Sequence, residues 1–432
     1  MALPIANHQN EFTSLDISFF TAISAVTVTG HTVVPTSTYW SVFGQGVIFL
    51  LMLVGGLGFM VVSTFLLLVI GQRSTLQERL MSSGFMRDTV GVEGMQGLRR
   101  IGRNVVLLVF VLYVLGTMGI FWQVRGLDGM GFGESLWKST FLSVSAFNNA
   151  GFNILPELPT GSSLARFATN PILLLMTTVL IVLGGLGWTV LLDIYRNRRF
   201  PRLGLDAKLV VVTSLALWGF GAVVLLIAEF SNPETLGSLG WADRVTGAVF
   251  GSASGRTAGF TTIDFGDVRD ITKLTYTGLM FIGGGAGSVA GGIKVVTFAV
   301  IVAAVVSSLR GRSHAEAFGR EIHQSQLHRA LAVAVLGIGL SMLLVAILTL
   351  TERDVLIEKG ISFVDLLFDT VSALGTTGAS TGIVPDLTVG GKAIFMVAMF
   401  VGRLGPVTLA LTLVPREEAT VYRFVRERVK IG

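Results

Sequence analysis

A short stretch that ends in glycine occurs four times in this chain, and each copy follows a segment too short to cross a membrane. The four copies are Ser24–Gly30, Ser145–Gly151, Ala253–Gly259 and Ser372–Gly378. The segments before them are Ser14–Val26, Gly133–Phe147, Trp241–Ser254 and Phe363–Leu374. A membrane-spanning helix needs about 20 residues, so segments of about a dozen predict half-helices that enter the membrane and turn back. Four copies of one element predict pseudo-fourfold symmetry.

The composition assigns these stretches to a membrane protein. Of the 432 residues, 51% are hydrophobic and 14% are charged, whereas about a quarter of the residues of a soluble protein are charged. The chain has no cysteine, which excludes disulfides, thiolate metal sites and cysteine nucleophiles. The sequence therefore predicts an all-α polytopic membrane protein. Apolar runs of spanning length cover residues 47–70, 104–124, 171–193, 209–229, 274–308, 330–350 and 391–414.

The half-helices and the spans follow one order: span, half-helix, glycine-ended loop, span. This order divides the chain into four membrane–pore–membrane repeats and a tail. The predicted limits are 1–72, 73–194, 195–309 and 310–414 for the repeats and 415–432 for a basic cytoplasmic tail. Residues 1–13 are too few to form a span before the first half-helix, so the first span of the first repeat is expected to be missing.

Basic residues predict the orientation. The loops 72–103, 194–208 and 309–329 and the tail after Val414 hold 20 of the chain's 32 Lys and Arg residues. Loops rich in Lys and Arg stay in the cytoplasm, so the glycine-ended loops face outward. The outer loops carry more acidic than basic residues. This excess either attracts cations to the outer face or merely solubilises the loops.

Glycine-ended loops that follow four half-helices are suited to binding a cation. The C-terminus of a helix carries partial negative charge, glycine adopts the positive φ that lets successive carbonyls face one way, and carbonyl oxygens can replace the water shell of an ion. Four ordinary turns between helices are the alternative. The candidate ion-binding residues are Thr27, Val28, Thr29, Gly30, Asn148, Asn149, Ala150, Gly151, Thr257, Ala258, Gly259, Thr376, Thr377 and Gly378.

We call the span that follows each glycine-ended loop the outgoing span. A run of glycines in the third outgoing span is expected to break its helix, because glycine destabilises a helix interior by about 1 kcal/mol relative to alanine. The run lies within 274–309, which is too long for one straight span. We interpret it as an intramembrane loop that gates the pathway; a packing kink is the alternative. A phosphate-binding loop would need a Gly-Lys-Ser/Thr ending, which is missing. The candidate gate residues are Gly283, Gly284, Gly285, Gly287, Ser288, Gly291, Gly292, Lys294 and, from another span, Arg403.

Two arginines have apolar surroundings. Three outgoing spans share a pattern of small residues that lets helices approach closely: Leu53–Gly58, Val182–Gly187 and Phe400–Pro406. Arg403 replaces a glycine of this pattern, and a charge at mid-span costs about 3 kcal/mol. We expect Arg403 to face a water-filled cavity or a carboxylate, where it either limits cation passage or is purely structural. Arg256 is expected to bind the free carbonyls at the end of its own half-helix.

These residues resemble those of the Trk/Ktr/HKT superfamily of potassium transporters, and most of all its KtrB branch. The stretches that carry the resemblance are Ser145–Phe152, Arg256–Phe260, Gly283–Lys294 and Gly402–Pro406. The resemblance implies four repeats around a central potassium pathway, with the gate in the glycine-rich loop and at Arg403. In related plant transporters a serine at the first filter position is associated with sodium preference, so Gly30 favours potassium. The implied filter glycines are Gly30, Gly151, Gly259 and Gly378.

The resemblance also implies a location and partners. The expected protein is a homodimer that crosses the bacterial plasma membrane several times, in contact with lipid and with a cytoplasmic, KtrA-like ring of nucleotide-binding subunits. The basic tail would contact either that ring or anionic lipid. Its cations are Arg416, Arg423, Arg426, Arg428 and Lys430. No nucleic-acid partner is expected, and no cofactor besides the transported ion, with sodium dependence left open.

The predicted function is potassium uptake driven by the membrane potential, which supplies about 2.3 kcal/mol per charge per 100 mV. A sodium-conducting or sodium-coupled transporter of the same fold is the alternative. A polytopic membrane enzyme is a more distant alternative. His314, His323 and His328 are expected in one cytoplasmic loop, without carboxylates at metal-ligand spacing. The chain is therefore not expected to be an enzyme.

Overall fold

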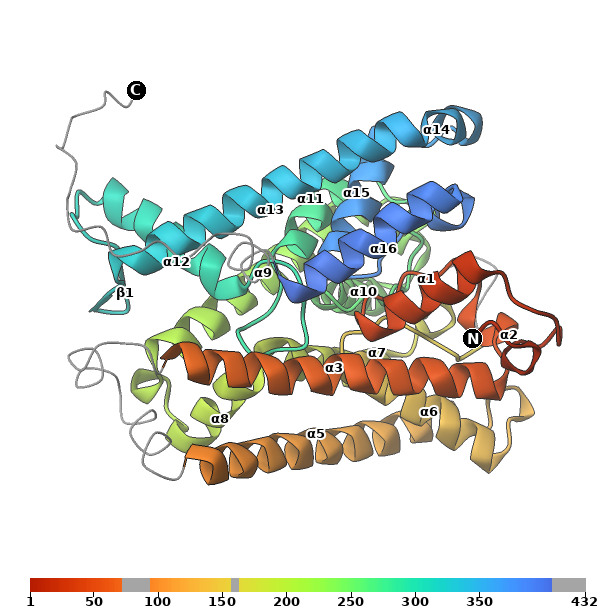
Figure 1. Cartoon of the computed structure of the whole chain (residues 1–432), viewed down its shortest axis with the longest axis horizontal. Coiled ribbons are helices and arrows are strands. Elements are labelled where there is room, and N and C mark those ends of the chain that lie inside the picture. Colours follow the sequence, from red (N-terminus) through yellow and green to blue (C-terminus); the bar gives the residue numbers. More distant parts are fainter. Residues whose placement is uncertain (72–93, 157–162, 406–432) are drawn as a thin grey trace.

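The structure, a computed structural model, describes residues 1–71, 94–156 and 163–405, and it is mainly helical (Figure 1). Within these residues, three helices are long and apolar enough to cross a membrane, and a bent pair would add a fourth span. Large apolar side chains such as Phe110, Leu215 and Val335 stay exposed on these helices. An apolar surface of this kind packs against lipid, so the fold is that of a multi-pass membrane protein. The longest helices are α3 (Val42–Gly71), α5 (Gly94–Val124), α9 (Leu205–Glu229) and α13 (Gln324–Thr351).

Four shorter helices coincide with the predicted half-helices to within one residue at each end. They are α1 (Leu15–Val26), α6 (Phe132–Phe147), α10 (Trp241–Ser254) and α15 (Phe363–Leu374). Each has an acidic residue in its first turn and no basic residue in its last turn. The acid stabilises the N-terminus, whereas the partial negative charge of the C-terminus is left without a cation in the same helix. Each half-helix is also anchored by a fully buried phenylalanine: Phe20, Phe141, Phe250 and Phe368.

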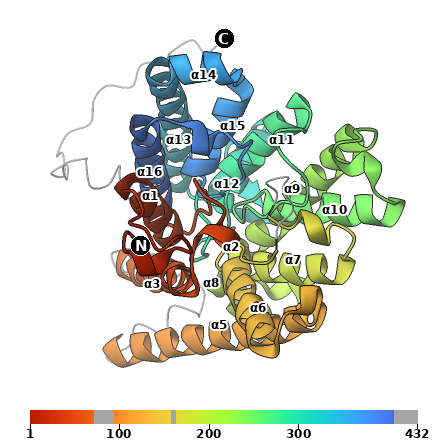
Figure 2. The same ribbon diagram turned by 90° about the vertical axis from the view of Figure 1, so that its right-hand side faces the viewer.

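The half-helices pack in a closed cycle. Each contacts the outgoing helix that precedes it in the chain: α6 contacts α3, α10 contacts α7 (Pro171–Leu186), and α15 contacts α11 (Asp270–Phe281). α1 contacts α16 (Val389–Leu404), which joins the beginning of the chain to its end. Figure 2 shows the groups of helices following one another around a central region. The cycle agrees with an interpretation as four repeats.

The outgoing helices differ in how they continue. α3 is continuous over 30 residues. α7 is followed by α8 (Trp188–Asn197), and the two helices are bent by 96°, so the apolar run over 171–193 does not form one straight helix. The bend occurs at Gly187, which has φ 86° and ψ 147°. Residues with a Cβ atom rarely adopt this conformation, and the glycine therefore permits the bend.

The third outgoing helix is also interrupted. Residues 282–294 separate α11 from α12 (Val295–Leu309), which confirms that the glycine run breaks the helix. α16 ends at Leu404, and Gly405 directly after it has φ 82° and ψ 142°, close to the angles at the bend after α7. The expected span over 391–414 continues into residues 406–414, which lie outside the described residues together with the basic tail 415–432.

Two of the long helices that precede a half-helix, α9 and α13, are followed or terminated by a glutamate that binds the N-terminus of the next outgoing helix. Glu229 ends α9 and accepts a hydrogen bond from the backbone N–H of Arg269, directly before α11, at 3.0 Å. Glu352 follows α13 and accepts from the backbone N–H of Thr388, directly before α16, at 2.8 Å. The first N–H groups of a helix have no partner within it, so these carboxylates fix where the outgoing helices begin.

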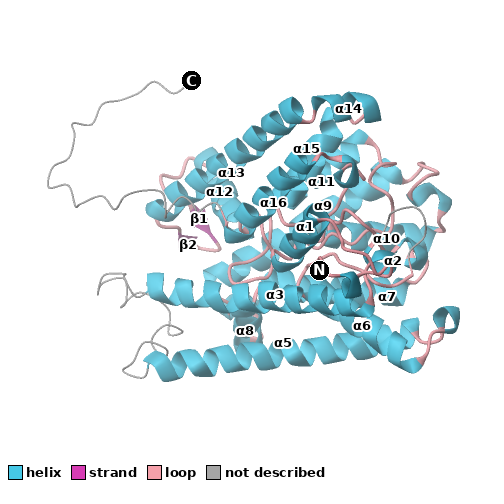
Figure 3. Ribbon diagram, turned by 45° about the vertical axis from the view of Figure 1, so that its right-hand side comes forward, coloured by secondary structure: helices cyan, strands magenta, loops and turns pink. Residues whose placement is uncertain are grey.

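The remaining elements are short. β1 (Glu316–Ala317) and β2 (Arg320–Glu321) form an antiparallel hairpin that pairs Glu316 with Glu321 and Ala317 with Arg320. Figure 3 shows this hairpin beside α12. The others are η1 (Pro4–Ala6), α2 (Thr36–Tyr39), η2 (Leu127–Gly129), η3 (Ala165–Phe167), η4 (Phe200–Arg202), η5 (Leu236–Ser238), α14 (Arg353–Lys359) and η6 (Val384–Asp386).

His314 and His323 lie in one connection between α12 and α13, as expected, whereas His328 does not. His323 precedes α13 and caps it, because its ring nitrogen accepts a hydrogen bond from the backbone N–H of Ser325 at 3.3 Å. His328 lies inside α13. Across the described residues, no group of three or more His, Cys, Asp or Glu side chains could hold a metal ion.

Candidate ion-binding ring and intramembrane loop

The four glycine-ended loops meet at one place. We call residues 27–30, 148–151, 256–259 and 375–378 ring segments 1 to 4, and together they contain all the candidate ion-binding residues. A Cβ atom built on each segment's glycine would come within 3.0 Å of a backbone carbonyl oxygen in another segment. Each segment therefore touches the next, and the fourth touches the first, which closes a ring. The contacts are those of Gly30 with Ala150, Gly151 with Ala258, Gly259 with Thr377 and Gly378 with Thr29.

The backbone torsions repeat around the ring. The ring glycines have φ between 71° and 93°, and the residue two places before each glycine also has positive φ, between 49° and 80°. Positive φ costs a residue other than glycine about 1–2 kcal/mol, and β-branched residues adopt it least readily. Strain at the same place in four different sequences indicates that the packing of the ring imposes it. The residues concerned are Val28, Asn149, Thr257 and Thr376.

Glycines of three outgoing helices bring those helices against the ends of the half-helices. A Cβ atom on any of them would overlap the carbonyl oxygen of the last residue of the adjacent half-helix. This observation confirms the expectation that the small residues of the outgoing spans permit a close approach. The contacts are those of Gly55 with Val26, Gly184 with Phe147 and Gly402 with Leu374.

Buried side chains support the ring from behind. The hydroxyl of Tyr113 in α5 donates to Oδ1 of Asn148 at 2.9 Å, and the side chain of Asn149 is 3.2 Å from the hydroxyl of Thr257 in segment 3. His31 directly follows segment 1 and packs edge-on against Phe395, with 5.8 Å between ring centroids. Sequence reasoning missed Tyr113 and His31, because a single aromatic residue in or near an apolar span carries no signal of its own.

Residues 282–294, here called the intramembrane loop, fold back on themselves between α11 and α12. The backbone N–H of Gly283 donates to the carbonyl of Ile293 at 2.8 Å, and that of Gly285 donates to Gly185 in α7 at 2.9 Å. A Cβ atom on Gly291 would overlap the hydroxyl oxygen of Thr376 in segment 4. The loop therefore lies against both the ring and α7. It contains every glycine and serine expected at the gate: Gly283, Gly284, Gly285, Gly287, Ser288, Gly291 and Gly292.

Two cations bind carbonyls of the intramembrane loop. Arg403 in α16 donates from Nη1 to the carbonyl of Val289 and from Nη2 to the carbonyl of Gly55 in α3, the latter at 2.8 Å. Lys294 donates from Nζ to the carbonyl of Ala290 at 2.6 Å. Arg403 thus connects α3, α16 and the loop. The expected cavity or carboxylate is not among these partners of Arg403.

Arg256 does not bind its own half-helix, and that expectation is wrong. Its Nη2 donates to the carbonyl of Gly283 at 2.7 Å, and its Nε donates to the carbonyl of Ile282 at 3.4 Å. These carbonyls belong to the first residues after α11. Beyond the end of α11 the backbone is not helical, so these two carbonyls have no helical N–H partner, and the guanidinium of Arg256 donates to them.

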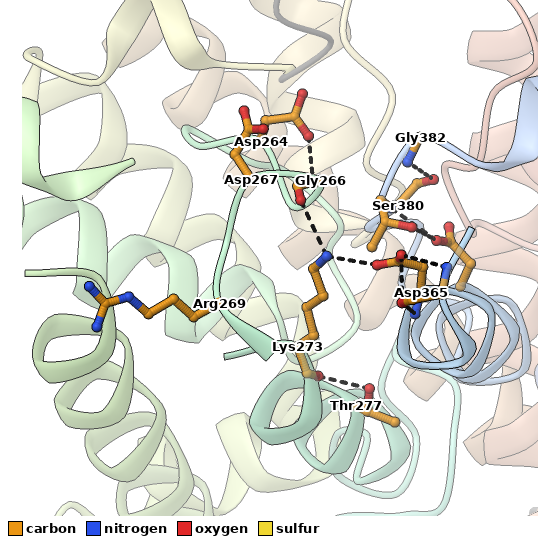
Figure 4. A network of polar contacts seen from close by, with 12 residues as sticks. Asp264, Gly266, Asp267, Arg269, Lys273, Thr277, Asp365, Ser380 and Gly382 are labelled. Carbon is orange, nitrogen blue, oxygen red and sulfur yellow. Dashed lines mark hydrogen bonds and ion pairs between the residues drawn. The ribbon is translucent and has the colours of Figure 1, made fainter. Parts of the chain in front are cut away.

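A polar network outside the ring joins α11 to α15 (Figure 4). Lys273, whose side chain is 8% exposed, donates to Oδ1 of Asp365 at 2.7 Å and to the carbonyl of Gly266 at 3.2 Å. Asp264 in the same loop accepts from the backbone N–H of Gly266 at 2.8 Å. Burial is the main cause that raises the pKa of the Asp264 carboxyl above its usual range. The network fixes the N-terminal end of α15, the fourth half-helix.

Comparisons with known proteins match nearly the whole chain. Residues 2–421 match the family model TrkH, described as a cation transport protein. The chain is 37% identical to Ktr system potassium uptake protein B of Bacillus subtilis, over 94% of this chain and 87% of that protein. It is 34% identical to Ktr system potassium uptake protein B of Vibrio alginolyticus (97% and 88%) and 32% identical to the potassium/sodium uptake protein NtpJ of Enterococcus hirae (100% and 93%).

A solved structure shows the same fold. The potassium transporter TrkH from Vibrio parahaemolyticus superimposes with a TM-score of 0.69 at 20% identity, over 94% of this chain and 79% of that one. The family match extends over nearly the whole chain, and the relatives above 30% identity are transporters by name. The chain is therefore a multi-pass protein of the bacterial plasma membrane and not an enzyme, and it belongs to the TrkH family of cation transport proteins.

Proposed function

We propose that this protein takes up potassium ions through the centre of the ring. The observation that carries this proposal is the closed cycle of contacts among the four ring glycines, with matching torsions in every segment. Backbone carbonyls contributed from four sides can replace the water shell of a cation. The C-termini of four half-helices end at the ring and add partial negative charge. The proposed potassium ligands come from ring segments 1 to 4, and no side-chain carboxylate is needed.

Potassium is favoured over sodium for two reasons. Two relatives at 37% and 34% identity are named potassium uptake protein B, and glycine occupies the last position of all four ring segments. The relative from Enterococcus hirae is named a potassium/sodium uptake protein. That name supports the second candidate function, a sodium-conducting or sodium-coupled transporter of the same fold.

The proposed gate is the intramembrane loop with Lys294 and Arg403. The loop touches ring segment 4 through Gly291, and the two cations bind its carbonyls. In this arrangement the loop and the cations obstruct an ion that has passed the ring, because a positive charge near the pathway repels a permeating cation. Opening then requires the loop to leave its present contacts.

The proposed partners follow from the relatives and from the charge of the chain. The two relatives named as parts of a Ktr system support an assembly with a cytoplasmic regulatory component. We propose that this component is a circular assembly of nucleotide-binding subunits and that the transporter is a homodimer. Its basic cytoplasmic loops would contact these regulatory subunits or anionic lipid. A change in the regulatory subunits would reach the pathway through the intramembrane loop.

Tracer uptake tests the proposed function. The purified protein in liposomes is expected to accumulate radioactive rubidium, a potassium substitute, against protein-free liposomes as a control. External potassium should suppress this uptake at least about tenfold more effectively than sodium, because selection by the ring is worth about 1.4 kcal/mol or more. Equal suppression by the two ions would favour the sodium-conducting alternative. Rubidium uptake no faster than in protein-free liposomes would contradict the proposal.

A further inference from the structure

Arg256 is the residue of ring segment 3 whose side chain extends from the ring to the intramembrane loop. Its side chain is 5% exposed and lies over the ring of Trp218, with 5.3 Å from the guanidinium carbon to the ring centroid. Its two carbonyl partners, Ile282 and Gly283, are the residues at which α11 gives way to the loop. Arg256 is therefore part of the ring through its backbone, and its buried guanidinium binds the loop through hydrogen bonds.

The equivalent residues of the other segments have different partners. The hydroxyl of Thr27 in segment 1 donates to the carbonyl of Ile23 in its own half-helix at 2.7 Å. Asn148 in segment 2 accepts a hydrogen bond from Tyr113, and segment 4 has a glycine, Gly375, at this position. Of the four positions, the one in segment 3 carries the side chain that hydrogen-bonds the intramembrane loop.

A second contact joins the ring to the other end of the loop. Gly291 lies so close to Thr376 of segment 4 that a Cβ atom on the glycine would overlap the threonine hydroxyl oxygen. The two ends of the loop are themselves paired, because the backbone N–H of Gly283 donates to the carbonyl of Ile293 at 2.8 Å. The loop cannot move away without separating Gly283 from Arg256 or carrying Arg256 with it. A buried cation that loses its partners has a large desolvation cost, so movement of Arg256 together with the loop is favoured.

We propose that Arg256 is a positioning residue that couples ion occupancy of the ring to opening of the intramembrane loop. The inference rests on the proposed function, because it takes the ring as the ion site and the loop as the gate. An ion held by the carbonyls of segment 3 fixes the backbone of Arg256, and the guanidinium passes this constraint to Ile282 and Gly283. Exchange of potassium for a poorly bound ion would release the backbone and loosen the loop.

The absence of cysteine from the chain gives a direct probe of the loop. Ser288 is fully buried in the loop, and the variant S288C introduces a thiol of similar size there. A charged thiol reagent added from the cytoplasmic side modifies this thiol when the loop opens. In liposomes with S288C, the modification rate should differ about fivefold or more between potassium and sodium media, the lower end of ordinary coupling between sites.

Arg256→Gln in the S288C background should reduce this difference to less than about twofold, because the neutral amide cannot hold both carbonyls. Arg256→Lys keeps the charge but not the fork of donors, and it should give an intermediate difference. Arg244→Gln is the matched control. Arg244 lies near the other end of α10, donates to the carbonyls of Leu239 and Gly237 at 2.8 and 2.7 Å, and stacks on Phe230 without touching the loop.

The outcomes separate the inference from the function on which it rests. A full potassium dependence in Arg256→Gln, or an equal loss in Arg244→Gln, would overturn the coupling. If Arg256→Gln does not fold, Arg256→Lys decides, since an undiminished difference in that variant also overturns it. Rubidium uptake is measured on the same liposomes. Potassium-selective uptake with an ion-independent loop in S288C alone contradicts the coupling and leaves the proposed function standing, whereas unselective uptake contradicts the ring as a filter.

Discussion

The side of the molecule that holds the half-helices is nearly the same four times, whereas the outgoing helices differ from one another. We call these two parts the outer half and the inner half, after the orientation that the basic loops predict. Every half-helix begins with an acid, buries a phenylalanine and ends in a segment with positive φ at the same two positions. The outgoing helices then diverge: α3 continues, the chain bends by 96° after α7, α11 is followed by a loop, and α16 ends at Leu404. An ion needs equivalent ligands from all sides, whereas a gate needs one element that can move alone. We interpret the difference as a separation of ion selection from gating.

Breaking the symmetry of the outer half should have the largest effect. Gly259→Ala places a Cβ atom against the carbonyl of Thr377 at a residue whose φ is 73°. We expect rubidium uptake to fall about 100-fold, which corresponds to about 2.7 kcal/mol. Gly278→Ala is the control, since a Cβ atom there has no neighbour within 4 Å, and it should leave uptake unchanged. Uptake by Gly259→Ala at the level of this control would refute the ring as an ion site.

The same contrast explains what the sequence could predict. The half-helices, the ring segments and the broken third span were recognisable because each has a local cause: segment length, a terminal glycine, or a run of glycines in an apolar stretch. The bend at Gly187 was missed because an isolated glycine is ordinary in a packed membrane helix. The partners of Arg256 and the role of Tyr113 depend on helices distant in the chain, so no local pattern contains them.

Moving an outgoing helix away from the end of a half-helix should have a smaller effect. Gly184→Ala would push α7 away from the carbonyl of Phe147, whereas Gly185→Ala meets its nearest neighbour, Nδ2 of Asn149, at an ordinary 3.5 Å. We expect the preference of uptake for potassium over sodium to fall about tenfold in the first variant, a loss of about 1.4 kcal/mol, and little in the second. Alanine is the better helix former by about 1 kcal/mol, so a loss in Gly184→Ala cannot come from helix propensity. Equal results for the two variants would contradict the close approach.

Removing a contact that holds the intramembrane loop in place should raise uptake. Arg403→Gln removes the cation that connects the carbonyls of Val289 and Gly55, so the intramembrane loop opens more often. We expect the initial rate of rubidium uptake to rise about fivefold, the scale of ordinary coupling energies, with selectivity preserved. Arg403→Lys sharpens the test. A rate that stays low in this variant shows that charge limits the flux, and a rate that rises as in Arg403→Gln shows that the connection of carbonyls does. A lower rate in Arg403→Gln would contradict the gate.

The smallest expected effect concerns the glutamates at the ends of α9 and α13, whose contacts differ from one another. Glu352 accepts two hydrogen bonds, both from Thr388, whereas Glu229 accepts four, from Arg269, Thr272, Asn232 and Thr235. In the predicted second repeat a neutral Gln123 lies near the end of α5 and accepts from the side chain of Asn170, which precedes α7, at 3.3 Å. An amide has one acceptor oxygen where a carboxylate has two.

Glu352→Gln therefore imitates the second repeat and should lower the free energy of unfolding by about 1 kcal/mol, and Glu229→Gln by about 2 kcal/mol, since it loses more charge-assisted hydrogen bonds. Thermal unfolding in detergent measures both, and rubidium uptake at low temperature should stay unchanged because neither residue touches the ring or the loop. The order of the two losses is decisive. If Glu352→Gln is the more destabilising, the number of donors held does not set the strength of these contacts, and the likeness between the repeats does not extend to how their outgoing helices are anchored.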